Sequence, residues 1–181
     1  VMDDLSVRAA IICGSLLEGV PAGRGEQTLK QRELRLPGCH DATLHGQAWL
    51  PERDLRSVVV VSHGLGEHSG RYAGLAARLV ACGHAVYAID HRSHGRSSGE
   101  RANIERFSYL VSDLSTFVGR AQREHPDQPV ILLGHSMGGA VALASALRIQ
   151  ATLKGLALSA PALAAGQAVS PFKAGMLRLV S

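Results

Sequence analysis

The chain has 181 residues, of which 46% are apolar and 19% are charged. This length and composition are typical of one globular domain with a sizeable core, and they exclude a disordered or fibrous chain. The net charge of +4 comes from basic residues that are interleaved with Glu and Asp, so the sequence does not predict a nucleic-acid-binding patch.

The elements expected from hydrophobic periodicity begin after residues 1–27, which we interpret as a variable N-terminal extension and a candidate for disorder. Alternating apolar and polar residues predict two half-buried strands at 30–36 and 43–50. From residue 58 onward, short apolar runs alternate with amphipathic stretches, which predicts an α/β fold whose parallel sheet carries helices on both faces. The further strands are expected at 58–61, 84–90, 130–133 and 153–160, and the helices at 72–80, 107–121 and 137–148.

The stretch 129–148 carries the strongest signal for chemistry. An apolar strand runs directly into the sequence G-H-S-M-G at 134–138, and a helical stretch follows, which is the context of a nucleophile elbow. The turn in such an elbow is so sharp that its central residue is strained, which lifts the hydroxyl of Ser136 clear of the sheet. Gly134 and Gly138 remove side chains that would collide where the strand and the helix approach. We therefore predict a nucleophilic Ser136, against the alternative of a glycine-rich turn with an incidental serine.

A nucleophilic serine also needs hydrogen-bond donors for the oxyanion that forms on the substrate. One candidate is the backbone N–H of Met137, at the start of a helix, where amide groups have no partner within the helix. The loop H-G-L-G at 63–66 follows a central strand, and its glycines allow the backbone to approach a substrate. We assign the second donor to the N–H of Leu65, against the alternative of a plain strand-to-helix turn.

Three motifs extend this interpretation through their sequences, their order and their spacing. They are H-G-L-G-E-H-S-G-R-Y at 63–72, D-H-R-S-H-G-R-S-S-G-E-R at 90–101 and G-H-S-M-G-G at 134–139. Together they resemble the monoacylglycerol lipase and lysophospholipase group of the α/β-hydrolase superfamily, the serine aminopeptidase-like hydrolases. The resemblance runs from about residue 30 to the end. It implies hydrolysis of monoacylglycerols or similar single-chain lipid esters through an acyl-enzyme on Ser136, without a metal or an organic cofactor.

The resemblance also implies roles for individual residues. It places Leu65 and Met137 in the oxyanion hole, and it implies that polar groups of the first motif face the glycerol pocket. The alternative for the charged members of that motif is a surface ion pair. The candidate substrate contacts are His63, Gly64, Glu67 and Arg71.

The sequence departs from the family pattern at two places. The family usually has Gly where Ser93 stands, so Ser93 is expected to be mildly strained if that position requires a positive φ. In this fold the acid and the base of the catalytic triad follow the serine, but no Asp, Glu or His follows Ser136. We therefore expect the triad acid and base, the last strands and most of the cap to be absent. The chain is then an N-terminal portion, with a core at 28–168 and the start of the cap at 169–181, and it should be inactive as given.

The cysteines and the expected cap bear on the cellular setting and on the partners of the protein. The three cysteines form no C-x-x-C pair and are odd in number, so we expect no disulfide framework or zinc site, and a reducing, cytoplasmic setting fits. The cap is a candidate for peripheral membrane contact, and the expected partner is a lipid ester rather than a nucleic acid. Two other functions stay open, a non-catalytic relative that binds acyl lipids or a partner, and an acyltransferase or peptidase on the same scaffold.

Overall fold

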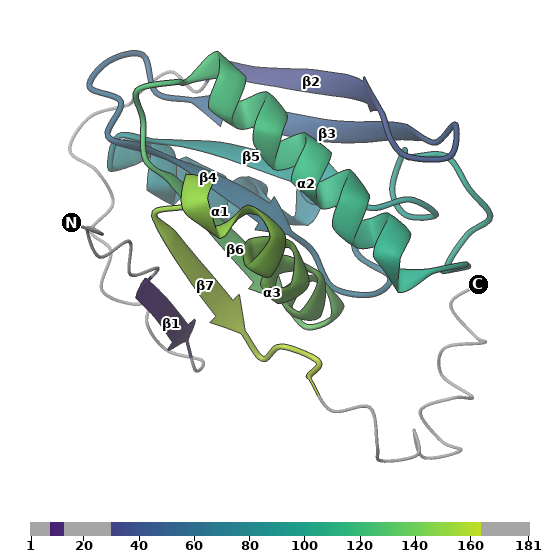
Figure 1. Cartoon of the computed structure of the whole chain (residues 1–181). Helices are drawn as coiled ribbons and strands as arrows, with labels where there is room; N and C mark the ends of the chain where they lie inside the picture. Colours follow the sequence, from purple (N-terminus) through teal and green to yellow (C-terminus); the bar gives the residue numbers. More distant parts are fainter. Residues whose placement is uncertain (1–7, 13–29, 164–181) are drawn as a thin grey trace.

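The computed structural model describes residues 8–12 and 30–163, which form one sheet with helices on both faces (Figure 1). The helices are α1 (Ala73–Ala81), α2 (Phe107–Glu124) and α3 (Met137–Ile149), with 3₁₀ turns η1 (Ser69–Tyr72) and η2 (Gln150–Thr152). The strands are β1 (Arg8–Ile12), β2 (Lys30–Pro37), β3 (Thr43–Leu50), β4 (Ser57–Ser62), β5 (His84–Asp90), β6 (Val130–His135) and β7 (Gly155–Ser159).

The sheet has the strand order β1-β7-β6-β4-β5-β3-β2. The β2–β3 and β3–β5 pairs are antiparallel, and the other neighbouring strands run parallel. The predicted α/β class and the mostly parallel sheet are therefore confirmed, and all the elements expected from residue 30 to 160 are present. The alternation in β2 predicts its faces correctly, because Leu34 and Leu36 are buried while Glu33 and Arg35 are exposed.

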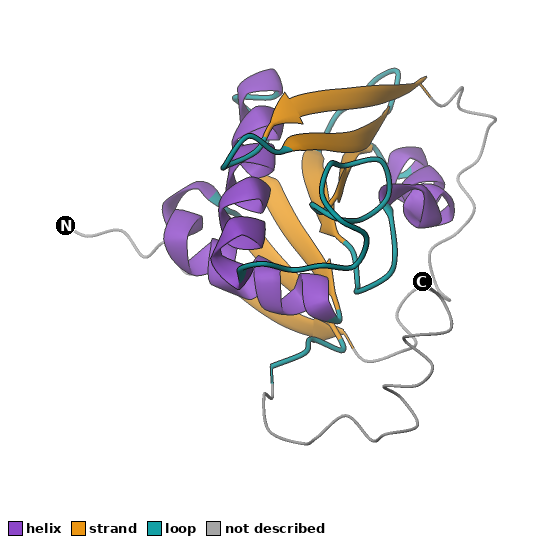
Figure 2. Ribbon diagram, turned by 90° about the vertical axis from the view of Figure 1, so that its right-hand side faces the viewer, coloured by secondary structure: helices purple, strands orange, loops and turns teal. Residues whose placement is uncertain are grey.

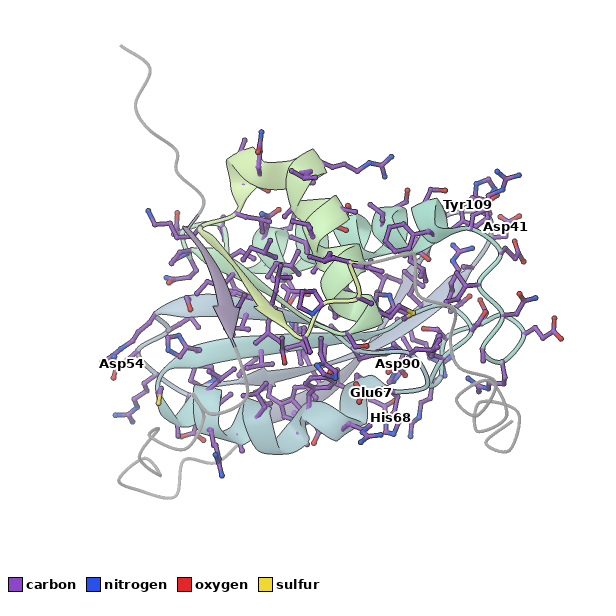
Figure 3. The ribbon with its side chains drawn as sticks, turned by 90° about the horizontal axis from the view of Figure 1, so that it is seen from below. Asp41, Asp54, Glu67, His68, Asp90 and Tyr109 are labelled. Carbon is purple, nitrogen blue, oxygen red and sulfur yellow. The ribbon has the colours of Figure 1, made fainter. Side chains whose placement is uncertain are left out.

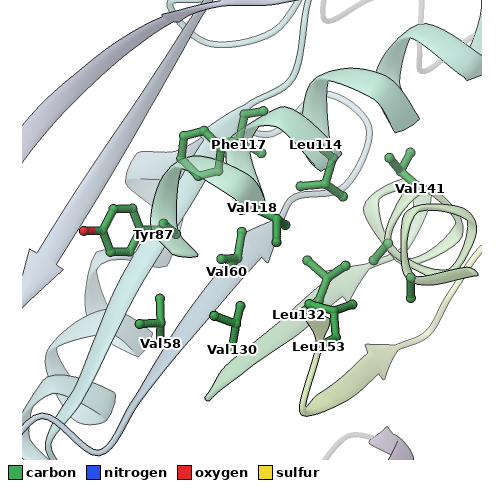
Figure 4. Close-up of a cluster of buried hydrophobic side chains, with 14 of the residues drawn as sticks. Val58, Val60, Tyr87, Leu114, Phe117, Val118, Val130, Leu132, Val141 and Leu153 are labelled. Carbon is green, nitrogen blue, oxygen red and sulfur yellow. The ribbon is translucent and has the colours of Figure 1, made fainter. Parts of the chain in front are cut away.

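Strand β4 lies at the centre of the sheet and is buried along its whole length. Its valines alternate between two cores: Val58 and Val60 pack on the side of α2 and α3, and Val59 and Val61 pack on the side of α1. Figure 2 shows α1 on the face opposite the other two helices, and Figure 4 shows Val58 and Val60 beneath Phe117 of α2. An uninterrupted apolar run is thus required here because helices cover both faces.

The sequence does not predict strand β1. Residues 1–27 were expected to be an extension and a candidate for disorder, but Arg8–Ile12 pairs in parallel with β7, from Arg8 opposite Gly155 to Ile12 opposite Ser159. A five-residue edge strand without alternation carries too little local signal, and it is specified by its neighbour. The pairing covers the outer edge of β7, which would otherwise expose unpaired backbone groups.

Several expectations fall wholly or partly outside the described residues. The cap start at 169–181 lies there, and so does any membrane contact through it; the expected core at 28–168 is described as far as residue 163. Cys39 and Cys82 are free thiols, and Cys13 is not among the described residues. No helix within 30–163 is both long and apolar enough to cross a membrane.

The loop that follows β5, residues 91–98, is largely buried and is held by polar contacts to neighbouring elements. Asp90 anchors it, because the carboxylate of Asp90 accepts hydrogen bonds from the N–H of Ser69 at 2.6 Å and from the N–H of Arg96 at 2.8 Å. Arg92 ties the loop to α2 through an ion pair with Asp113, Nε to Oδ2, at 2.7 Å. Ser93 has φ 64, so the strain expected at this position is confirmed.

Candidate active site

Ser136 occupies the junction between β6 and α3 with φ 51 and ψ −119, a conformation that non-glycine residues rarely adopt. The surrounding backbone holds it there. Its N–H donates to the carbonyl oxygen of Ser159 at 3.0 Å, and its own carbonyl oxygen accepts from the N–H of Ala162 at 3.0 Å and of Gly139 at 2.9 Å. The sequence motif predicts the strain, but it gives no sign that the end of β7 and the segment after it clamp the residue.

The glycines around Ser136 allow α3 to lie against β4 and β6. A Cβ at Gly134 would lie 2.5 Å from the carbonyl oxygen of Gly138. A Cβ at Gly138 would lie 2.2 Å from the carbonyl oxygen of Ser62 and 2.3 Å from that of His63. Both contacts are with backbone, which cannot rotate away, so the expected close approach of strand and helix is present.

This packing leads to a first prediction, made for the extended protein, meaning the 181 residues with any sequence that continues their reading frame. We expect Gly138→Ala to lower the free energy of unfolding by about 3 kcal/mol or more, because the methyl group overlaps β4. Gly74→Ala in α1 is the matched control. It meets no atom within 4 Å and should stabilise by about 0.5–1 kcal/mol. Urea unfolding measures both, and equal effects would contradict the packing argument.

The loop at 63–66, which we call the oxyanion loop, faces Ser136. A Cβ at Gly64 would lie 3.4 Å from the Cβ of Ser136. The N–H of Leu65 donates to no acceptor in the described part of the chain, and the Leu65 side chain is 42% exposed. Met137 begins α3, where backbone N–H groups lack a partner in the helix. The structure therefore brings Gly64, Leu65, Ser136 and Met137 to one place.

His63 is expected to contact the substrate, but its ring lies in the interior of the protein. It has no exposed surface, and both ring nitrogens are engaged. Nδ1 donates to the carbonyl oxygen of Gly64 at 2.7 Å, and Nε2 accepts from the N–H of His91 at 3.0 Å. The side chain therefore belongs to the support of the oxyanion loop rather than to a surface that a substrate could touch.

Glu67 and Arg71 are among the residues that line a cavity of about 320 Å³ between α1 and the strands β6 and β7. One carboxylate oxygen of Glu67 is occupied by hydrogen bonds within the protein. Its Oε2 accepts from the N–H of Gly64 at 3.1 Å and from the hydroxyl of Tyr72 at 2.9 Å. Although burial raises it, these hydrogen bonds hold the pKa of Glu67 below its ordinary value. Nε of Arg71 lies 3.7 Å from Oε1 of Glu67, in an ion pair whose arginine is 60% exposed and whose glutamate is 19% exposed. Figure 3, a view from below, shows Glu67 well apart from Asp54.

The lining of the cavity is mainly apolar. Besides Glu67 and Arg71, the lining residues are Tyr72, Leu75, Leu133, His135, Ala157, Leu158 and Ser159. The sequence does not indicate Tyr72 as a polar member of this site, because its position at the start of an amphipathic stretch predicts only packing. Its place as the last residue of the first motif was the signal that could have indicated a polar role.

The described residues after Ser136 include no acid and no histidine. His135, the neighbour of the serine, forms a hydrogen bond between its Nδ1 and the hydroxyl of Ser159 at 3.2 Å. The hydroxyl of Ser136 itself has no hydrogen-bond partner among residues 30–163. The described part of the chain thus holds the candidate nucleophile and the candidate oxyanion donors, but no histidine that is hydrogen-bonded to the Ser136 hydroxyl.

Buried imidazoles next to the oxyanion loop lead to a second prediction, on stability. Burial lowers the pKa of His63 to about 4 from 6.5, and it lowers the pKa of His91 in the same direction. Between those values the unfolded chain binds more protons, so the free energy of unfolding should rise with pH from about 4 to 6.5. His63 contributes on the order of 3 kcal/mol. The lowered pKa values of Asp90 and Glu67 act in the same direction at lower pH.

Urea unfolding of the extended protein at a series of pH values checks this. In His63→Asn the free energy of unfolding should rise less steeply with pH between pH 4.5 and pH 6.5. The part of the rise that remains is expected from His91. Ser108→Ala, at an exposed residue that carries no titratable group, is the control and should leave the slope unchanged. An unaltered slope in His63→Asn would contradict the assignment.

Comparison with known proteins agrees with this geometry. The family described as serine aminopeptidase, S33, matches residues 53–181. The chain is 47% identical to a monoacylglycerol lipase of Mycolicibacterium smegmatis over 123 residues, covering 68% of this chain and 44% of that protein. It is 41% identical to human monoglyceride lipase over 152 residues, covering 83% of this chain and 50% of that protein. The chain thus spans about half the length of these curated relatives.

Solved structures give the same result for the fold. A thermostable carboxyl esterase from Bacillus coagulans, solved in complex with glycerol, superposes with a TM-score of 0.66 at 30% identity. The match covers 72% of this chain and 44% of the esterase. A monoglyceride lipase from Saccharomyces cerevisiae superposes with a TM-score of 0.67 at 24% identity, covering 78% of this chain and 48% of that one. The chain therefore belongs to the serine aminopeptidase S33 family and has the α/β-hydrolase fold.

Proposed function

We propose that this chain supplies the nucleophile and the oxyanion hole of a serine hydrolase that cleaves monoacylglycerols or similar single-chain lipid esters. The observation that carries the proposal is Ser136 itself: a serine held at φ 51 between a strand and a helix, facing a loop with an unpaired N–H. The names of the relatives, monoacylglycerol lipase and monoglyceride lipase, support the choice of substrate class.

The reaction then follows from the geometry. A base from outside the described residues takes the proton of Ser136, and Oγ attacks the carbonyl carbon of the ester. The electron pair of the C=O bond moves to oxygen, where the N–H groups of Leu65 and Met137 stabilise the charge. The C–O bond breaks as the carbonyl re-forms, and glycerol leaves with the proton. Water then attacks the acyl group on Ser136 in the same way and releases the fatty acid.

The cavity supports the choice of an amphiphilic substrate. Leu75, Leu133 and Ala157 contribute apolar surface to its lining, while Glu67 and Arg71 contribute charged groups. We propose that these two charged residues receive the glycerol end of the substrate and that Arg71, whose side chain is 60% exposed, is the more available of the two. Gly64 contributes backbone alone, and its missing side chain leaves room for the ester beside Ser136.

A substrate comparison tests this function and is a third prediction. The extended protein should hydrolyse a monoacylglycerol with a kcat/KM at least about tenfold above that for the amide with the same acyl chain. It should release free fatty acid rather than transfer the acyl group to an added alcohol. Faster cleavage of the amide would favour a peptidase, and dominant transfer would favour an acyltransferase. Binding of the lipid without turnover would favour a non-catalytic relative.

A further inference from the structure

One peptide unit in the oxyanion loop is held more firmly than its neighbours. The carbonyl oxygen of Gly64 accepts two hydrogen bonds, from Nδ1 of His63 at 2.7 Å and from the N–H of Glu67 at 3.2 Å. This oxygen belongs to the same planar trans peptide as the N–H of Leu65. In a trans peptide the C=O and the N–H point in opposite directions. Fixing the oxygen of Gly64 therefore fixes the direction of the Leu65 N–H.

The ring of His63 is itself immobilised. Its Nε2 accepts the N–H of His91, which requires that Nε2 carries no proton and that Nδ1 carries one. The ring lies edge-on to His91, with 4.7 Å between the centroids, and 5.3 Å from the ring of His94. All three side chains are buried. The imidazole thus connects the oxyanion loop to the rigid loop that follows β5.

Packing does not restrain the far side of the oxyanion loop. A Cβ built at Gly66, which has φ 73, would meet no atom within 4 Å, and the Leu65 side chain is 42% exposed. Two glycines flank Leu65, so the backbone there has unusual freedom. Donors stabilise a developing charge efficiently only when they do not have to reorient during the reaction. Hydrogen bonds to Gly64 are therefore the main restraint on this donor.

We propose that the His63 imidazole is a positioning residue, which aims the N–H of Leu65 at the oxyanion by holding the carbonyl of Gly64. The inference rests on the proposed function of Ser136. Glu67 assists from the other side of Gly64, through its N–H to the Gly64 oxygen and through Oε2 to the Gly64 N–H, while the hydroxyl of Tyr72 holds Oε2. His63 acts on the transition state through the backbone and does not touch the substrate.

Asparagine and glutamine side chains each place a polar atom near one of the two ring nitrogens of histidine. Substitutions by these residues therefore separate the two hydrogen bonds that His63 makes. In His63→Asn the side-chain amide nitrogen stands near the position of Nδ1, so the bond to Gly64 can form while the bond from His91 is lost. In His63→Gln the side-chain oxygen reaches the position of Nε2, so the bond from His91 can form while the bond to Gly64 is lost. His63→Phe loses both bonds at a similar shape.

Steady-state kinetics of the extended protein on a monoacylglycerol is the test. We expect kcat to fall by about 10–10²-fold in His63→Gln and His63→Phe, and far less in His63→Asn, with KM unchanged. A trifluoromethyl ketone, which forms an oxyanion on Ser136, should bind more weakly in the same order. His68→Gln, at an exposed histidine, is the matched control. Equal losses in Asn and Gln variants, or losses in KM alone, would overturn the proposal.

A second measurement does not depend on activity. Nitrogen-15 NMR of the imidazole rings should show His63 protonated at Nδ1 and bare at Nε2 at neutral pH. A ring protonated at Nε2 would overturn the proposal even if Ser136 is the nucleophile. Conversely, activity retained in Ser136→Ala would refute the proposed function while leaving the NMR result intact, so the two failures are distinguishable.

Discussion

Replacing Ser136 by alanine is expected to abolish ester hydrolysis by the extended protein, with a loss of about 10⁶-fold in turnover. The hydroxyl is the group that forms the covalent intermediate, and Ser136 is the residue with the strained backbone at the junction of β6 and α3. KM should change little, because the cavity and the oxyanion loop remain. Hydrolysis of a short-chain p-nitrophenyl ester measures the loss.

An exposed serine provides the control for this variant. Ser108 lies in the first turn of α2 on the surface, and Ser108→Ala should keep full activity. The Ser136→Ala variant should also unfold at a similar urea concentration to the parent, since the alanine keeps the backbone hydrogen bonds to Ser159 and Ala162. Retained activity in Ser136→Ala would remove the serine from the mechanism.

Replacing Leu65 by proline is expected to lower turnover by about 10²–10³-fold, because proline has no N–H to donate to the oxyanion. Leu65→Ala is the matched variant, since it keeps the N–H and removes only a side chain that is 42% exposed. Its turnover should stay close to that of the parent. Measurement of kcat and KM for both variants separates the two roles of this residue. Equal losses would show that the side chain, rather than the amide, matters here.

The proline variant also needs a check of the backbone. Gly64 precedes it and tolerates the conformations that proline imposes on the preceding residue. The hydrogen bonds to Gly64 from His63 and Glu67 do not involve the nitrogen of Leu65. The fold should therefore persist, and circular dichroism of the variant should match that of the parent.

Local patterns in the sequence predict the strands that are buried on both faces and the strands that are buried on one face. The unbroken valines of β4 and the alternation of β2 both correspond to the burial that the structure shows. Strand β1 escapes prediction because its five residues pair only with β7, far along the chain. The position of an edge strand depends on its neighbour, and a short sequence window does not contain that neighbour.

In the candidate site, too, the sequence predicts local features but not the contacts between segments that are distant along the chain. The strand–glycine–serine–helix order predicts the strained position of Ser136, since that strain is local. The clamp on its backbone by Ser159 and Ala162 requires β7 to lie beside β6, which is a tertiary fact. The burial of His63 and the bond between Tyr72 and Glu67 are likewise contacts between loops. The sequence motifs indicate candidate residues, but which of these residues face a substrate depends on tertiary contacts that a motif does not contain.

The most direct test of the central claim is covalent labelling of the extended protein with a serine-directed phosphonate, followed by peptide mapping by mass spectrometry. We expect a single adduct, on the peptide that contains Ser136, and no adduct in Ser136→Ala. The reagent phosphorus mimics the tetrahedral carbon of the reaction, so labelling needs both the nucleophile and the oxyanion donors. An adduct on another residue, or equal labelling of Ser136→Ala, would show that Ser136 is not the nucleophile.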